Sequence, residues 1–138
     1  MAGPSTDSRL VNPPGLKQQS YYNHAVLRAG TPVFLTGQVA WDQNGDLIGL
    51  GDIAAQATQV WANIDILLRA VGASRQDIVK IVTYALSRDS LPALHAARGA
   101  FFGEGPYPAS TFLLVAGLAE PELLVEIDVT LMLPPPAA

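Results

Sequence analysis

Two carboxylates, Glu126 and Asp128, interrupt the apolar run "LLVEIDVTLML" at residues 123–133. In a strand, successive side chains point to opposite faces, so both acids would share one face with Thr130, opposite the aliphatic residues. A buried carboxylate without a partner is costly. Glu126 is therefore either a solvent-facing carboxylate of a half-exposed sheet, or it holds a water molecule or polar ligand in a cleft between subunits. We expect Asp128 to be solvated or ion-paired near the end of the strand.

The two histidines, His24 and His95, are the other candidates for acid–base chemistry. Neither has the spacing of a metal-binding pair, and no GxSxG motif supplies a nucleophilic serine. We interpret His24 as a surface residue at a strand end and His95 as a partly exposed helix residue, with a role as general base as the alternative. The chain has no cysteine, which excludes disulfides and thiol catalysis. Fingerprints for phosphates and dinucleotides are missing as well, so we expect no metal and no cofactor.

Hydrophobic periodicity and turn residues predict the elements that position these groups. The first elements are two strands within residues 24–42 around a turn at residues 29–32, followed by a turn at Asn44-Gly45. A helix then runs from the N-cap Asp52 to about Val71, and a capping box of Ser74 and Asp77 precedes a strand over residues 78–87. The last elements are a helix from the N-cap Ser90 to about Phe102 and strands over residues 110–118 and 123–133. This order predicts an α+β fold in which one mixed sheet is covered by two helices.

The chain of 138 residues fits one domain. We expect a loose N-terminal arm over residues 1–20, the domain over residues 21–133 and a Pro-rich tail over residues 134–138. Only 14% of the residues are charged and 49% are apolar, whereas soluble domains carry about 25% charged residues. Some apolar surface is therefore expected to be buried against other copies of the chain, in a homo-oligomer.

The charge balance and the apolar runs exclude several classes of partner. Twelve acidic and eight basic residues give a net charge of −4, and no basic cluster offers a nucleic-acid footprint. No run reaches membrane-spanning length, and residues 1–20 lack the apolar core of a signal peptide. The sequence predicts a cytoplasmic protein without nucleic-acid or membrane partners.

Several segments, in order and at matching spacing, resemble the Rid (YjgF/YER057c/UK114) family, of which the enamine/imine deaminase RidA is the best-known member. They are "YYNHAV", "VFLTGQV", "GDIAAQATQVWANIDILLRAVGAS", "DIVKIVTYALS", "FF" before "YPAST", and "VEIDV", and they span roughly residues 20–133. The resemblance implies a chorismate-mutase-like (YjgF) fold, assembled as a homotrimer with clefts between subunits for a small-molecule ligand or substrate. It also implies chemistry that needs no cofactor.

Roles follow from the resemblance by position. In the deaminases of this family a Glu on the last strand positions the water that attacks an imine carbon, and the position corresponds to Glu126. The cleft tyrosine corresponds to Tyr22, so we expect Glu126 and Tyr22 to be catalytic. The substrate-binding residues are expected to be Thr36, Gly37, His95, Arg98, Ser110, Thr111 and Phe112.

One position departs from the family pattern. In "PAST", residues 108–111, Ser110 stands where the deaminases carry an arginine that binds the substrate carboxylate. A serine offers neither the charge nor the paired donors of a guanidinium, and breaking a buried charged pair costs about 3–5 kcal/mol. We therefore expect a hydrolytic, deaminase-like enzyme whose cleft suits a neutral or bulkier substrate. Arg98 either replaces the lost charge from the second helix or is a surface arginine. The alternatives are a non-catalytic metabolite-binding or regulatory trimer, and a slow RidA-type deaminase.

Overall fold

Strand β6 (Val125–Leu133) shows the alternation that the sequence predicts. Its aliphatic residues are buried under the helices, and its polar residues are half-buried on the other face. The buried set is Val125, Ile127, Val129 and Leu131, and the half-buried set is Glu126, Asp128 and Thr130. The two carboxylates therefore lie on the face of the sheet that the helices leave open.

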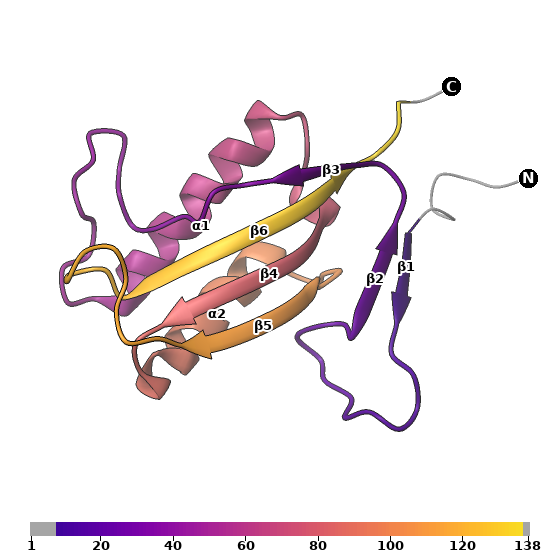
Figure 1. Cartoon of the computed structure of the whole chain (residues 1–138), viewed down its shortest axis with the longest axis horizontal. Helices are drawn as coiled ribbons and strands as arrows, with labels where there is room; N and C mark the ends of the chain where they lie inside the picture. Colours follow the sequence, from indigo (N-terminus) through magenta and orange to yellow (C-terminus); the bar gives the residue numbers. More distant parts are fainter. Residues whose placement is uncertain (1–7, 137–138) are drawn as a thin grey trace, which may run out of the picture.

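The structure is a computed structural model that describes residues 8–136. Its main sheet has the strand order β3-β6-β4-β5, with β3 at Thr31–Phe34, β4 at Ile78–Ala85 and β5 at Ala109–Leu114. Strand β6 runs antiparallel to β3 and β4, whereas β4 and β5 are parallel. Helices α1 (Ile53–Ala70) and α2 (Leu91–Phe102) lie together behind the sheet in Figure 1. The predicted α+β fold, one mixed sheet covered by two helices, is confirmed.

Helix α1 begins and ends at the predicted residues. The Asp52 carboxylate accepts a hydrogen bond from the backbone N–H of Ala55 at 3.0 Å, which satisfies one of the free donors of the first turn. After Ala70 the chain reaches Gly72 at a φ of 77°, a conformation that favours glycine and stops a helix. The core residues of α1 are Ala57, Val60, Trp61, Ile64 and Leu68.

The two strands predicted on either side of the turn near Gly30 are present, but they do not pair with each other. Strand β2 (Ala25–Arg28) pairs with β1 (Ser8–Val11), whereas β3 pairs with β6. Gly30 separates β2 from β3 at a φ of 140°, and a Cβ on it would collide with the carbonyl oxygen of Leu133. The chain thus passes from a small two-stranded sheet into the main sheet at this glycine, and Figure 1 shows β1 and β2 beside the main sheet.

The predicted loose arm contains strand β1, so part of it is ordered by pairing with β2. Residues 1–7 of this arm lie outside the described residues, as do residues 137–138 of the predicted tail. Residues 134–136 follow β6 without regular secondary structure.

Neither helix within the described part of the chain is both long and apolar enough to cross a membrane.

The entry into α2 differs from the prediction in its cap. Ser90 is the N-cap residue, but its side chain makes no capping hydrogen bond. A short 3-10 turn, η3 (Arg88–Ser90), precedes the helix, and the Ser87 hydroxyl accepts the N–H of Asp89 at 3.1 Å. The predicted capping box of Ser74 and Asp77 is confirmed in the turn η2 (Arg75–Asp77).

Candidate functional site

The open face of the sheet carries a cluster of Glu126, Asp128 and Tyr84. Tyr84 on β4 lies directly across from Glu126 on β6, and its hydroxyl donates to a carboxylate oxygen of Asp128 at 3.2 Å. The negative charge of Asp128 raises the pKa of Tyr84, with burial as a smaller cause. The phenol therefore keeps its proton for this hydrogen bond. Asp128 was expected to be solvated or ion-paired, and its partner is a neutral hydroxyl instead.

The Glu126 carboxylate is half-buried on the open face of the sheet. Burial raises its pKa, and repulsion by Asp128 raises it further. Among residues 8–136, Tyr84 donates to Asp128 and no group donates to Glu126. A partly desolvated carboxylate without an internal partner can take a proton from a bound water molecule.

Thr36, Gly37 and Gln38 lie beside this carboxylate because they continue the line of β3 along β6. The backbone groups of Gln38 and Ile127 exchange two hydrogen bonds, at 2.9 and 3.0 Å. Between the strand and this bridge, Gly37 comes so close to β6 that an added Cβ would collide with Oε2 of Glu126 and lie 2.8 Å from Oδ1 of Asp128. Only a glycine leaves the Glu126 carboxylate in its observed position.

We predict that Gly37→Ala displaces the Glu126 carboxylate and impairs whatever chemistry it supports. The added methyl group meets both acids of the cluster, so the activity should fall by about 100-fold, as misplacing a reacting group by 1 Å can cost. Gly117→Ala is the matched control, because a Cβ at Gly117 meets nothing within 4 Å and this glycine, like Gly37, does not have a left-handed φ. Turnover and thermal unfolding of both variants measure the effect. Equal activity of the two variants would contradict a site at Gly37.

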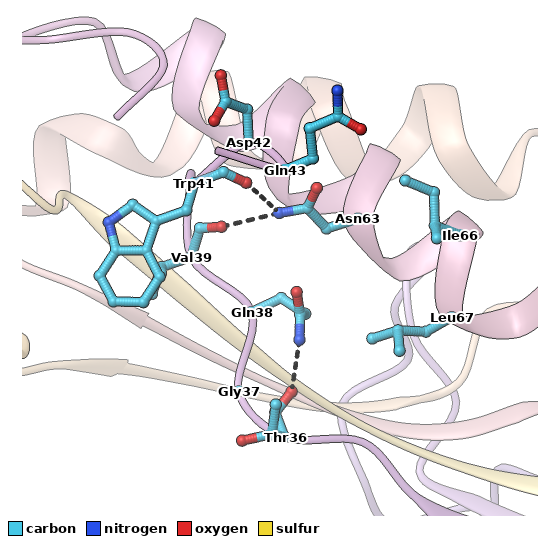
Figure 2. Close-up of a pocket in the computed structure, with 10 residues that line it drawn as sticks. All are labelled: Thr36, Gly37, Gln38, Val39, Trp41, Asp42, Gln43, Asn63, Ile66 and Leu67. Atoms are coloured by element: carbon cyan, nitrogen blue, oxygen red, sulfur yellow. Dashed lines mark hydrogen bonds between the residues drawn. The ribbon is translucent and has the colours of Figure 1, made fainter. Parts of the chain in front are cut away.

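A pocket of about 520 Å³ opens on the other side of the same segment (Figure 2). The side-chain amide of Asn63 on α1 fixes its rim by donating to the backbone oxygens of Val39 and Trp41, at 3.1 and 2.9 Å. Ile66 and Leu67 of α1 form an apolar wall. The segment of residues 36–38 therefore separates an apolar pocket from the carboxylate cluster.

A second cluster gathers beside α2. The ring of Tyr21 lies 5.1 Å from that of His95 and 5.2 Å from the guanidinium carbon of Arg98. Tyr22 makes edge contacts with Tyr21 and His24, at 5.6 and 5.3 Å between ring centroids. The interpretation of Arg98 as a surface arginine is wrong, since it is only 8% exposed.

This second cluster also contains Tyr21, which no sequence motif had singled out. Tyr21, rather than Tyr22, contacts both His95 and Arg98. The doublet "YY" was the available signal, although a doublet cannot tell which ring faces the helix. His95 is partly exposed, as predicted for a helix residue. Burial, and to a smaller extent the charge of Arg98, lowers the pKa of His95, which favours the neutral imidazole.

The residues of β5 divide between the two faces of the sheet. Ser110 lies in parallel register with the core residue Ile81, so its side chain faces the helices. Phe112 lies on the same face and packs against the core. Thr111 lies on the open face, where its hydroxyl accepts a hydrogen bond from Nζ of Lys80 at 2.8 Å.

The predicted site residues thus form two groups within one chain. The open face holds Glu126, Gly37 and Thr111, and the helix side holds His95, Arg98, Ser110 and Phe112, with Tyr22 beside that group. The sheet lies between the groups, so one chain does not bring them together around one small ligand. In residues 8–136, no group of three or more His, Cys, Asp or Glu side chains could hold a metal ion.

Comparison with known proteins connects this geometry with a family. A family model described as endoribonuclease L-PSP matches residues 15–132. A RutC family protein of Synechocystis is 33% identical over 114 residues, which cover 82% of this chain and 86% of the relative. The chain belongs to the Rid family. Its mixed sheet under two helices is therefore the Rid fold, including the open face on which Glu126 lies.

Two further relatives of this Rid protein bear on its fold and function. A protein of Dermatophagoides farinae named 2-iminobutanoate/2-iminopropanoate deaminase is 30% identical over 78% of this chain and 81% of its own length. The crystal structure of YyfB from Yersinia pestis, a Rid protein of unknown function, superposes with a TM-score of 0.86 at 39% identity, over 92% of this chain and 99% of YyfB. At the level of the family, these relatives support a role as a small-molecule enzyme.

Proposed function

We propose that this Rid protein is a cofactor-free hydrolase that releases ammonia from imines or enamines, in clefts between the subunits of a homotrimer. The observation that carries the proposal is the Glu126 carboxylate, which is half-buried, has a raised pKa and takes no hydrogen bond from the described residues. Its place beside Gly37, on the strand that follows the family pattern, supports the same role. The deaminase name of one relative agrees with it.

The chemistry needs only water and a base. Glu126 takes a proton from a bound water molecule while the water oxygen bonds to the carbon of the protonated imine, and the electrons of the C=N π bond return to the nitrogen. Glu126 then gives this proton to the nitrogen of the tetrahedral intermediate, the C–N bond breaks to release ammonia, and the hydroxyl proton passes to Glu126 as its oxygen becomes the carbonyl of the product. Tyr22 is proposed to line the cleft on the side of the substrate.

A homotrimer is proposed because each subunit alone leaves the site incomplete. Glu126 and Arg98 lie on opposite sides of the sheet, so a cleft containing both needs the open face of one copy and the α2 side of another. The open sheet face and the low proportion of charged residues support the burial of surface between copies of the chain. The cytoplasmic location and the lack of nucleic-acid partners remain predictions. The net charge of −4 favours a small-molecule role over nuclease activity, despite the description of the matching family model.

Ser110 suggests that the substrate differs from the short 2-imino acids of RidA. A serine leaves more space than an arginine and supplies no charge from β5. A larger substrate is therefore proposed. The same observation also favours a second candidate, a metabolite-binding trimer without catalysis, since a lost binding residue can accompany lost chemistry.

Ammonia release from freshly generated 2-iminopropanoate and 2-aminoacrylate tests the proposal. We expect slow turnover by the unaltered protein and an increase of at least about 10-fold in Ser110→Arg, because a bidentate charged contact with the carboxylate is strong. Ser110→Ala is the matched control and should leave the rate low. The increase should vanish in Ser110→Arg combined with Glu126→Ala. If no variant releases ammonia from these substrates or from bulkier imino acids, the binding trimer becomes the better account.

A further inference from the structure

Arg98 is a buried charge without a partner among the described residues. Its side chain is only 8% exposed, and its Nε atom is buried without any hydrogen bond. The ion pairs within residues 8–136 are Arg28 with Asp77 and Arg69 with Asp65, so Arg98 takes part in neither. Arginines are seldom fully buried unless they are paired. The fold therefore keeps a positive charge in a place where it lacks a counter-ion.

Neighbouring groups compensate this charge only in part. The ring of Tyr21 attracts the guanidinium through its π-system at 5.2 Å. Tyr107 is also near, but its hydroxyl donates to the backbone oxygen of Gly103 at 2.9 Å. Burial lowers the pKa of Arg98, although the group stays charged at pH 7. A bound anion would supply the missing partner.

We propose that Arg98 binds the carboxylate of the substrate from helix α2, in place of the strand arginine that Ser110 lacks. The proposal rests on the proposed function, since it concerns the same cleft. The side chain of Ser110 faces the helix side of the sheet, the side on which α2 carries Arg98. Nε and a terminal nitrogen along one edge of a guanidinium form the paired donors that suit a carboxylate. The substrate is accordingly an organic anion, in contrast to the neutral substrate expected from the loss of the strand arginine.

Tyr21 is the ring that lies over the guanidinium, and it is the group we expect to move when the anion binds. Nε of Arg98 has no exposed surface, so a ligand reaches it only if a covering ring shifts. Tyr21 lies in the connection between β1 and β2, outside both sheets, and is itself half-buried. Its ring is therefore less constrained than the groups of α2 and β5.

Binding of a 2-oxo acid and of its ester tests the proposal without requiring turnover. The probes are 4-methyl-2-oxopentanoate, the product expected from the corresponding imino acid, and its methyl ester, which lacks the charge. Calorimetric titration at fixed ionic strength should show that the unaltered protein binds the acid on the order of 10- to 100-fold more tightly than the ester, as expected for a hydrogen bond to a charged group. Arg98→Gln should remove this preference, and Arg98→Lys should keep part of it.

Control variants separate the contact from a general effect of charge. Arg69→Gln removes an arginine whose side chain is 80% exposed and should bind the acid as the unaltered protein does. In the Arg98→Gln background, Ser110→Arg should restore binding of the acid if both positions serve one pocket. If Arg98→Gln does not fold, the test uses Arg98→Lys instead. It then also compares the rise in Tm that the acid and the ester cause in the unaltered protein.

The outcomes distinguish this inference from the proposed function. Equal binding of acid and ester, or unchanged binding by Arg98→Gln, would overturn the role of Arg98 even if the protein releases ammonia. If binding of the acid depends on Arg98 but no imino acid is hydrolysed, the anion site stands and the proposed catalysis falls. Both stand together only if turnover requires Glu126 and tight binding requires Arg98.

Discussion

Glu126→Gln is expected to lower the turnover of the best imine substrate by about 10²- to 10⁴-fold, the usual contribution of a positioned general base. The amide keeps the size and shape of the carboxylate but cannot accept a proton from water. Binding of substrate should change little, so the loss should appear in kcat rather than in KM. Ammonia release under saturating substrate measures it. Circular dichroism and the Tm of the variant check that the fold is kept.

The pH profile of the unaltered enzyme provides the companion observation. Glu126 acts as a base only when deprotonated, so activity is lost as the pH falls through its pKa. Because burial and Asp128 raise this pKa, the acid limb of the profile should lie above the pH at which an ordinary glutamate titrates. Asp128→Asn removes the repulsion and should move the limb to lower pH. An unchanged rate in Glu126→Gln would rule out Glu126 as the base. An acid limb at the same pH in the unaltered enzyme and in the variants of Glu126 and Asp128 would rule it out as well.

Gln56→Leu is expected to lower the free energy of unfolding by about 3 kcal/mol, because leaving one buried polar group unpaired costs about 1–3 kcal/mol. Gln56 on α1 is fully buried. Its side-chain nitrogen donates to the backbone oxygens of Gly49 and Glu122, at 3.1 and 2.9 Å, and its oxygen accepts the N–H of Leu124 at 2.9 Å. A leucine fills the space but leaves the oxygen of Glu122 and the N–H of Leu124 without these partners, whereas the oxygen of Gly49 keeps the N–H of Asp52 at 2.9 Å.

Urea unfolding followed by circular dichroism tests this prediction, with a lower midpoint at an unchanged slope as the expected result. Gln59→Leu on the same helix is the control, since Gln59 makes one hydrogen bond, to the side chain of Asn63 at 2.9 Å. The free energy of unfolding of Gln59→Leu should fall by less than about 1 kcal/mol. Because Gln56 holds the segment just before β6, the variant should also loosen the approach to Glu126. Equal stability of the two variants would contradict the role assigned to Gln56.

Elements with local signals could be predicted from the amino-acid sequence. The alternation in residues 123–133 predicted both the buried face of β6 and the face that carries Glu126 and Asp128. Helical spacing of apolar residues, with Asp52 before them and Gly72 after them, predicted α1. These patterns succeed because an amphipathic segment has to bury one face, so the face can be read from the period alone. The family motifs then supplied the expected roles of the site residues, which stay a prediction.

The tertiary structure decided the partners of these elements. The segment around Gly30 has a turn signal, yet β2 and β3 separate there because pairing with β1 and β6 involves residues distant in sequence. Burial of Arg98 under Tyr21 and the close approach of Gly37 to Glu126 likewise depend on contacts between separate segments. Whether a charge is solvated or buried follows from what the whole fold packs against it, and no local pattern contains that information.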